Sequence, residues 1–236
     1  MVQVSYLATL DVVSANPINW GEAVSSYDLS EVPTLAVDSE NSSALAGADE
    51  IQGSLMAEAV ILVDENDNVI GPMTKVESHR GPGAYHRAFS VMLFDNSGRL
   101  LLQRRAASKI TFPSVWANTC CSHPLHCESE MELHDALGVK RAAIRKLGHE
   151  LGIEESQIPI DTFQFVTRMR YQARQDAIWI ERELDHCLVV HGDVDITVNS
   201  NEVDEILWVS PEQLEDMLIA DDPDNVIAPW FRCIAA

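Results

Sequence analysis

The chain has 236 residues, of which 46% are apolar, and its 37 acidic residues outnumber 16 basic ones to give a formal charge of −21. This length and apolar content suffice for one sizeable hydrophobic core and exclude a fully disordered chain. The negative charge argues against a nucleic-acid or anionic-membrane binder, and no apolar run reaches the roughly 20 residues of a membrane span.

The first part of the chain is acidic and lacks a periodic pattern. Residues 1–74 hold 12 carboxylates and no Lys, Arg or His. We expect residues 1–53 to be an acidic, disordered extension and residues 54–236 to form the folded domain. The extension is unlike an Arg-rich transit peptide, and residues 1–10 lack the basic start of a signal peptide. Five cysteines, an odd number, fit free thiols in a reducing compartment.

Strand patterns separated by turn residues open the folded part and recur after a helical pattern. The predicted strands are Ala57–Val63, Val69–Ile70, His86–Phe94, 99–104, Phe163–Tyr171 and Ile178–Val190. Turn residues after the first and the third of them predict two hairpins. Residues 105–131 form a long loop, which in a compact domain usually carries function.

Two segments predict helices. Residues 135–151 carry apolar side chains at helical spacing, and Gly152 ends the pattern as a C-terminal cap. A second helix begins after Ser210 and runs to Leu218, because a hydroxyl cap is followed by proline and then by Gln213 at the capping-box position. Strands, one long helix, further strands and a late helix predict a mixed α/β (α+β) domain.

A stretch rich in cysteine and histidine lies in the long loop, with the sequence Asn-Thr-Cys-Cys-Ser-His-Pro over residues 118–124. A thiol close to an imidazole could act as a nucleophile, an acid or a base. A zinc site is an alternative, although no second CxxC or HxxxH pair is present. Its ligands would come from Cys120, Cys121, His123, His126 and Cys127. Two buried thiols beside a surface histidine are the third interpretation.

Two further pairs of residues could bind a metal. Glu181 and Glu183 lie two apart on a predicted strand, so both face one side, where they would raise a pKa or share a cation. His79 and His86 could act as transition-metal ligands if the Gly-Pro-Gly loop between them folds back. Solvated acids and unrelated surface histidines are the simpler interpretation of each pair taken alone.

Six of the 16 basic residues gather around these loops and the long helix. They are Lys75, Arg104, Arg105, Lys109, Arg145 and Lys146. Arginine forks and lysine ammonium groups suit phosphates. The helix surface also needs charge for solubility, which is the alternative explanation for the two residues on the helix.

The long helix also matches part of the Nudix pattern REUxEExGU, in which U is a bulky apolar residue. The matching residues are Arg145, Leu147, Glu150, Gly152 and Ile153. Lys146 and His149 stand in place of two acids. Nudix pyrophosphohydrolases use those acids to bind divalent ions, so the match implies a Nudix-like fold in which hydrolysis is weakened or absent.

Taken together, the motifs resemble type I isopentenyl-diphosphate isomerase, a divergent Nudix family, over residues 58–230. The segments that carry the resemblance are His86–Ser90, Leu101–Arg105, Asn118–Pro124, Glu181–Glu183 and Pro229–Trp230. The resemblance implies a Nudix-like mixed β-sheet flanked by helices. It also implies an intramolecular C=C isomerase of isoprenoid biosynthesis, which interconverts isopentenyl diphosphate and dimethylallyl diphosphate by metal-assisted protonation and deprotonation.

The family's metal ligands transfer to this sequence position by position. By resemblance, one divalent metal, Zn²⁺ or Mn²⁺, is bound by His79, His86, His123, Glu181 and Glu183. The resemblance further implies that Glu150 binds a Mg²⁺ that also holds the diphosphate.

The family's other roles transfer in the same way. The substrate-binding positions fall on Lys75, Arg105, Lys109, Lys146 and Trp230. Glu183, with Tyr171 nearby, resembles the proton-donating side of the active site, and Cys121 resembles the opposite side.

The resemblance implies one partner, a small allylic or homoallylic diphosphate. We expect a monomer that binds neither nucleic acid nor membrane, in the cytoplasm, with plastid and peroxisome left open. Two alternatives remain. The long helix motivates a Nudix pyrophosphohydrolase, and the cysteine cluster with the acidic extension motivates a non-catalytic zinc-binding or scaffold protein.

Overall fold

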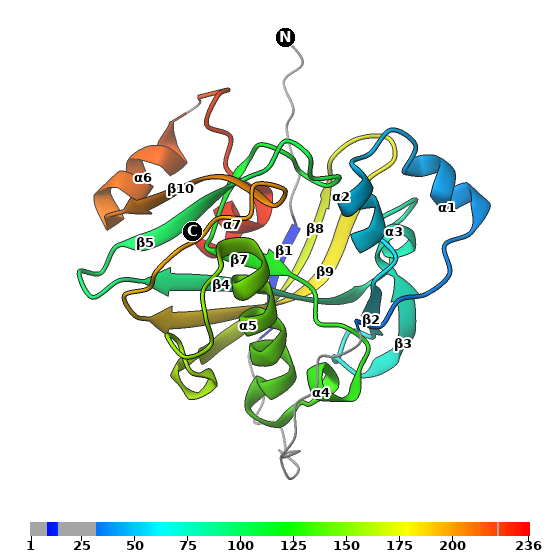
Figure 1. Ribbon diagram of the computed structural model, residues 1–236, viewed down its shortest axis with the longest axis horizontal. Coiled ribbons are helices and arrows are strands. Elements are labelled where there is room, and N and C mark those ends of the chain that lie inside the picture. The colour runs from blue at the N-terminus through cyan, green and yellow to red at the C-terminus, as the bar shows by residue number, and fades with distance from the viewer. Residues whose placement is uncertain (1–8, 14–31, 221) are drawn as a thin grey trace.

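The computed structural model describes residues 9–13, 32–220 and 222–236 (Figure 1). Ten strands form one mixed sheet, whose central path runs β1-β8-β9-β4-β2-β3. The strands are β1 (Thr9–Val13), β2 (Ala59–Val63), β3 (Val69–Thr74), β4 (His86–Phe94), β5 (Leu100–Arg105), β6 (Trp116–Ala117), β7 (Cys120–Ser122), β8 (Gln164–Arg174), β9 (Ile180–His191) and β10 (Val203–Val209). The helices are α1 (Ser39–Ala44), α2 (Glu50–Leu55), α3 (Lys75–Ser78), α4 (Glu128–Met131), α5 (Leu137–Leu151), α6 (Pro211–Ile219) and α7 (Pro229–Ile234).

Strand β4 lies at the centre of the sheet and sets the position of its neighbours. Along its full length it pairs in parallel with β9, so that His86 lies opposite Glu183 and Phe94 opposite His191. Its other edge is shared by β2, β7 and β5. The predicted hairpin between His86–Phe94 and the next strand is therefore wrong in extent: β5 meets β4 at a single position and pairs instead with β10 and β6.

Alternating side chains of β4 supply two hydrophobic cores, one on each face of the sheet. Phe89, Val91 and Leu93 pack on one face with α5, which runs across the sheet in Figure 1. Met92 faces the other way and packs with Met169 and the aromatic residues of α7. This period-2 separation is what a central strand requires. It also separates the residues that face α5 from those that face the opposite side.

The two predicted helices are present, although α5 begins at Leu137, two residues later than predicted, and α6 ends at Ile219, one residue later. Helix α5 ends at Leu151, and Gly152 adopts the left-handed φ of +63°. A Cβ at this position would lie 2.8 Å from the carbonyl oxygen of Thr197, so glycine is required both for the conformation and for the close approach. Helix α6 begins with a complete capping box, in which the Ser210 and Gln213 side chains bond to each other's backbone.

The chain before residue 54 differs from the predicted extension. Its described part includes α1 and α2, which are capped by the side chains of Asp38 and Asp49. Helices this short are unstable alone, and contacts with the domain hold them. Gln52 donates to the backbone oxygen of Asn201 at 3.0 Å, and Arg80 donates to Asn41. Disorder is therefore wrong for residues 32–53, whereas residues 1–8 and 14–31 lie outside the described part.

Several elements were not predicted, among them β10, α7 and the short strands within the long loop 105–131. The loop contains β6, β7 and α4 between its irregular segments. Within the described ranges, no helix is long and apolar enough to cross a membrane.

Candidate active site

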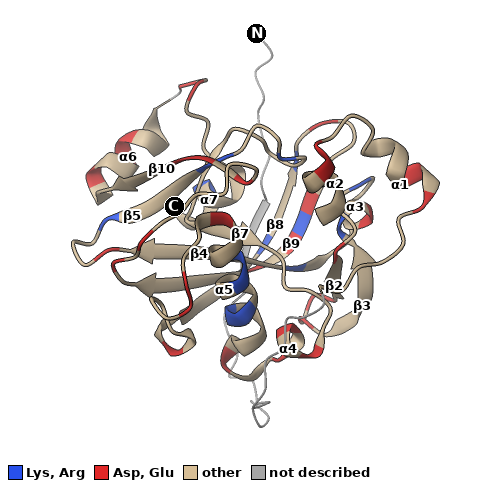
Figure 2. Ribbon diagram, viewed as in Figure 1, with Lys and Arg blue, Asp and Glu red and all other residues tan. Residues whose placement is uncertain are grey.

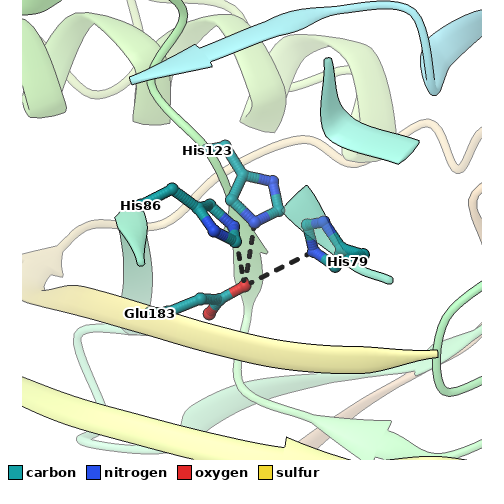
Figure 3. Close-up of side chains that lie close together, drawn as sticks. All are labelled: His79, His86, His123 and Glu183. Atoms are coloured by element: carbon teal, nitrogen blue, oxygen red, sulfur yellow. Dashed lines mark hydrogen bonds and ion pairs between the residues drawn. The ribbon is translucent and has the colours of Figure 1, made fainter. Parts of the chain in front are cut away.

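Three imidazoles and one carboxylate meet from four separate segments of the chain. His79 follows α3, His86 begins β4, and His123 follows β7. Their Nε2 atoms lie 3.7, 3.6 and 2.9 Å from the same atom, Oε1 of Glu183 on β9 (Figure 3). All four residues are buried. The candidate ligand atoms lie within 4.8 Å of one another, close enough to hold one metal ion.

The backbone fixes the tautomer of two of these histidines. Nδ1 of His79 lies 2.8 Å from the carbonyl oxygen of Lys75, and Nδ1 of His86 lies 2.7 Å from that of Ala84. Because a carbonyl oxygen only accepts, each Nδ1 carries the proton and each Nε2 presents a lone pair toward Glu183. Neither Nε2 has a hydrogen-bond partner among the described residues. Buried polar atoms are normally paired, so two lone pairs facing a carboxylate fit a bound divalent cation.

Burial favours the neutral form of His79 and His123, and the imidazoles favour the charged form of Glu183. Burial lowers the pKa of His79 to about 4 and that of His123 well below its ordinary value, against the pull of the Glu183 carboxylate. Burial also acts to raise the pKa of Glu183. The hydrogen bond with His123 and the two other imidazoles outweigh it, and this pKa lies well below the ordinary value. Three imidazole nitrogens and one carboxylate oxygen form a donor set that suits a divalent transition metal.

Strand β9 brings two more acids to the same side. Glu181, Glu183 and Asp185 alternate along the strand and line one cavity. Burial and the Glu183 charge raise the pKa of Glu181 well above its ordinary value and that of Asp185 to about 8. Ser90 on β4 donates a hydrogen bond to Asp185 at 2.8 Å. At neutral pH Asp185 is therefore mostly protonated, and Glu181 holds a proton more readily than Glu183.

The two adjacent cysteines of β7 face opposite sides of the sheet. Cys120 packs in the core beneath α5, with its Sγ 3.5 Å from Oε2 of Glu150. Cys121 lines the cavity, and Nη1 of Arg105 lies 3.7 Å from its Sγ. Burial raises the pKa of the Cys121 thiol to about 12, although the Arg105 charge opposes the shift. The cavity wall therefore presents a protonated thiol at neutral pH.

The cavity holds about 560 Å³ of empty space, part of which is open to solvent. Cations line it together with the acids and the thiol: Lys75, Arg105 and Lys109. Burial and the neighbouring Arg105 lower the pKa of Lys109 to about 8, while Glu202 opposes this shift. In a chain of charge −21, these cations make one side of the cavity suitable for an anion.

Trp230 on α7 forms an aromatic wall of the cavity. Its Nε1 donates a hydrogen bond to Oδ1 of Asn118 at 3.0 Å, and the Arg105 guanidinium carbon lies 5.5 Å from its ring centroid. The rings of Phe112 and Tyr171 meet it edge-on at centroid distances of 5.5 and 6.2 Å. These contacts fix the ring in a single orientation beside the cavity.

Helix α5 adds a layer of charge behind the cavity wall. Figure 2 marks the Lys and Arg residues of this helix in blue. Nζ of Lys146 lies 3.2 Å from Oε1 of Glu150, and Gln103 donates to Oε2 of Glu150 at 3.1 Å. Burial acts to lower the pKa of Lys146, but Glu150 and Glu202 raise it above the ordinary value. Lys146 is therefore a permanent, compensated cation where the Nudix pattern has an acid.

The structure brings most of the predicted site residues together. Four of the five predicted ligands form the metal group, and Glu181 lines the adjoining cavity wall. The same cavity is lined by Cys121, Lys75, Arg105, Lys109 and Trp230. Five predicted residues lie outside the lining of this cavity in the described structure: the ligands His79 and His86 of the metal group, and Tyr171, Lys146 and Glu150.

Some alternatives from the sequence do not fit this geometry. The described residues contain one group of potential metal ligands, and it includes no cysteine, which contradicts the zinc site proposed for the cysteine-rich loop. Arg145 pairs with Glu130 at 2.7 Å and contacts the backbone of His123. It therefore supports the loop that carries His123 and does not line the cavity.

Among the lining residues that sequence reasoning did not assign to the site are Gln52, Ser90 and Asp185. Asp185 continues the alternation of Glu181 and Glu183, so the pattern that identified those two acids could have included it. Gln52 had no such signal, because it lies in the segment that was predicted to be disordered.

Comparisons with known proteins agree with this geometry. The NUDIX domain family matches residues 84–231. The chain is 48% identical over 205 residues to the isopentenyl-diphosphate delta-isomerase of Gibberella zeae, and the aligned region covers 84% of this chain and 80% of that protein. It is 46% identical over 192 residues to isopentenyl-diphosphate Delta-isomerase 1 of Bos taurus, covering 79% of this chain and 85% of the relative.

A solved structure supports the fold alone. The protein DR0079 from Deinococcus radiodurans superposes with a TM-score of 0.55 at 18% identity, covering 75% of this chain and 97% of the other. The sequence relatives are far more similar and extend over most of the chain, which confirms the resemblance seen in the motifs. The chain therefore belongs to the NUDIX family and, within it, to the isopentenyl-diphosphate delta-isomerases.

Proposed function

We propose that this protein interconverts isopentenyl diphosphate and dimethylallyl diphosphate. The observation that carries the proposal is that the Cys121 thiol and the Glu183 carboxylate line one cavity whose cations suit a diphosphate. Relatives at 46–48% identity bear the name of this activity.

The reaction moves a double bond by one carbon. A proton adds to the terminal CH₂ carbon of isopentenyl diphosphate, which leaves a tertiary carbocation, and a second proton then leaves the CH₂ group on the other side of that carbon. No atom or electron is gained or lost overall. The step needs an acid and a base within reach of two different carbons.

Glu183, with Tyr171 behind it, is the proposed proton-donating side, and Cys121 is the opposite side. Glu181, whose pKa is raised by burial and the Glu183 charge, is the proposed source of the proton beside Glu183. Arg105, close to the Cys121 sulfur, stabilises the thiolate that accepts a proton. In the reverse direction the protonated Cys121 thiol donates a proton and the charged Glu183 carboxylate accepts one. The same two residues therefore serve both directions of the interconversion.

The carbocation needs an electron-rich, dry surrounding. The face of Trp230 provides negative quadrupole density, and its ring is fixed by Asn118 and neighbouring aromatic residues. Gln52 and Met56 of the α2 segment line the cavity from the N-terminal side and help to exclude water. Water that reached the cation would trap it as an alcohol.

The diphosphate group is proposed to bind Lys75, Arg105 and Lys109, with Lys146 adding positive potential from behind. We propose Zn²⁺ or Mn²⁺ for the three histidines with Glu183, and Mg²⁺ at Glu150 for the diphosphate. A divalent cation at the histidines would hold the Glu183 carboxylate in place and assist proton delivery. We also propose a cytoplasmic monomer that binds neither nucleic acid nor membrane.

Hydrolysis of a diphosphate bond is the second candidate, because α5 belongs to the NUDIX domain. The cation Lys146 argues against it, since a lysine stands where the pattern needs an acid.

Nuclear magnetic resonance of labelled isopentenyl diphosphate, incubated with the protein and Mg²⁺, tests the proposal. Appearance of dimethylallyl diphosphate supports it. Release of free phosphate would favour the hydrolase, and an unchanged substrate would favour a protein without either activity.

A further inference from the structure

A buried carboxylate outside the reacting groups lies beside the cations of the cavity. Glu202, just before β10, is 2% exposed. Its Oε2 forms an ion pair with Nζ of Lys109, and its Oε1 accepts a hydrogen bond of 3.0 Å from Nε2 of Gln52. Nδ1 of His149 lies 3.9 Å from the same Oε1. None of the roles proposed above uses this carboxylate.

Lys109 is difficult to keep charged at the cavity wall. Its side chain is only 10% exposed, and burial and the like charge of Arg105 lower its pKa. A buried ammonium without a partner loses its proton or turns toward solvent. Glu202 supplies the opposite charge that favours the ammonium.

Glu202 is itself held in place from three directions. Its backbone N–H donates to the carbonyl of Asn199 at 2.9 Å, and its carbonyl accepts from the N–H of Ala106 at 3.0 Å. The N–H of Lys109 in turn donates to the carbonyl of Ala106 at 3.1 Å. Together with the hydrogen bond from Gln52 to Oε1 of Glu202, these bonds connect Glu202 and the backbone of Lys109 in one network.

We propose that Glu202 is a positioning residue, which holds the Lys109 ammonium against the cavity for the diphosphate. An ammonium group has three donors, so the ion pair leaves two for the substrate. Gln52, which also lines the cavity, orients the carboxylate from α2. The inference rests on the proposed function in so far as it takes the anion in the cavity to be a diphosphate.

The variant Glu202→Gln tests this role, because it keeps an oxygen acceptor for Gln52 and removes the negative charge that pairs with Lys109. We expect KM for isopentenyl diphosphate and Kd for inorganic pyrophosphate, both measured with Mg²⁺, to rise about tenfold, with kcat within about twofold. The matched control is Asp204→Asn, an exposed carboxylate that bonds the backbone of Ala107 and should change neither constant.

A double-mutant cycle tests whether Glu202 acts through Lys109. Once Lys109→Met has removed the ammonium, adding Glu202→Gln should weaken pyrophosphate binding by less than about twofold. The conservative variant Glu202→Asp shortens the side chain by one methylene but keeps its charge, so it should give a smaller rise in the Kd for pyrophosphate than Glu202→Gln. If Glu202→Gln does not fold, Glu202→Asp and Gln52→Ala test the same link.

Unchanged constants in the folded Glu202 variants, or a full effect of Glu202→Gln in the Lys109→Met background, would overturn the inference. Its failure is distinguishable from that of the proposed function. A wild-type protein that binds pyrophosphate but forms no dimethylallyl diphosphate would defeat the proposed function, while the pyrophosphate measurements would still decide the role of Glu202.

Discussion

The two ends of the cavity solve opposite electrostatic problems. At the histidine end, formed by His79, His86, His123 and Glu183, one carboxylate faces three imidazoles, and the Nε2 atoms of His79 and His86 have no hydrogen-bond partner among the described residues. At the cation end, formed by Lys75, Arg105 and Lys109, positive groups exceed the buried carboxylate Glu202 that pairs with one of them. The first end suits a cation and the second suits an anion.

The comparison teaches why one cavity can hold both a divalent metal and a diphosphate. The buried groups at each end are stabilised by a ligand of complementary charge, because burial weakens their solvation by water. The reacting groups Cys121, Glu181 and Glu183 line the same cavity as Lys75, Arg105 and Lys109. Variants that remove a residue of one end should leave ligand binding at the other end measurable. Metal binding and pyrophosphate binding can therefore be tested separately.

The largest effect is expected for Glu183→Gln, which removes the charge that the three imidazoles face. Isomerisation should fall by at least about 10³-fold, because both proton transfer and metal retention depend on this carboxylate. Initial rates and bound metal measure the two losses, and circular dichroism checks the fold. Near-normal turnover in the folded variant would show that the assigned role is wrong.

Cys121→Ala should reduce isomerisation by about 10²–10⁴-fold, because it removes the group on the opposite side from Glu183. Bound metal should be unchanged, since no cysteine belongs to the metal group of the described residues. Cys127→Ala is the matched control, a half-buried thiol that does not line the cavity. Equal loss in both variants would contradict a specific role for Cys121.

His86→Ala should weaken metal binding by about 10–100-fold, because one of the four donors is lost. Elemental analysis after dialysis measures the metal, and pyrophosphate binding reports on the cation end, which should change little. His191→Ala, at the far end of β9, serves as the control. Full metal occupancy in His86→Ala would exclude the histidine end as the metal site.

The smallest effect concerns pH at the cation end. Lys109, with a pKa of about 8, is charged below that pH and loses its charge as the pH rises through it. KM for isopentenyl diphosphate should therefore rise several-fold between about pH 7 and pH 9. Lys109→Arg, whose guanidinium stays charged, should flatten this rise. An equally steep rise in that variant would assign the titration to another group.

Much of this architecture could be predicted from local patterns. Alternation along β4 and β9, the helical period of α5 with its glycine cap, and the capping box of α6 all depend on residues close together in the chain. The site residues could be named because their types and order resemble one family. The pairing of distant segments had no local signal.

The sequence by itself determined the elements that carry their own periodicity or cap, and the chemical types of the ligands. Only the tertiary structure decided that β4 pairs in parallel with β9, which places His86 opposite Glu183, and that α2 contributes Gln52 to the cavity. The physical reason is the distance along the chain over which each effect acts. Side-chain periodicity acts within one segment, whereas strand pairing and the docking of short helices require contacts between distant segments that form only when the whole domain folds.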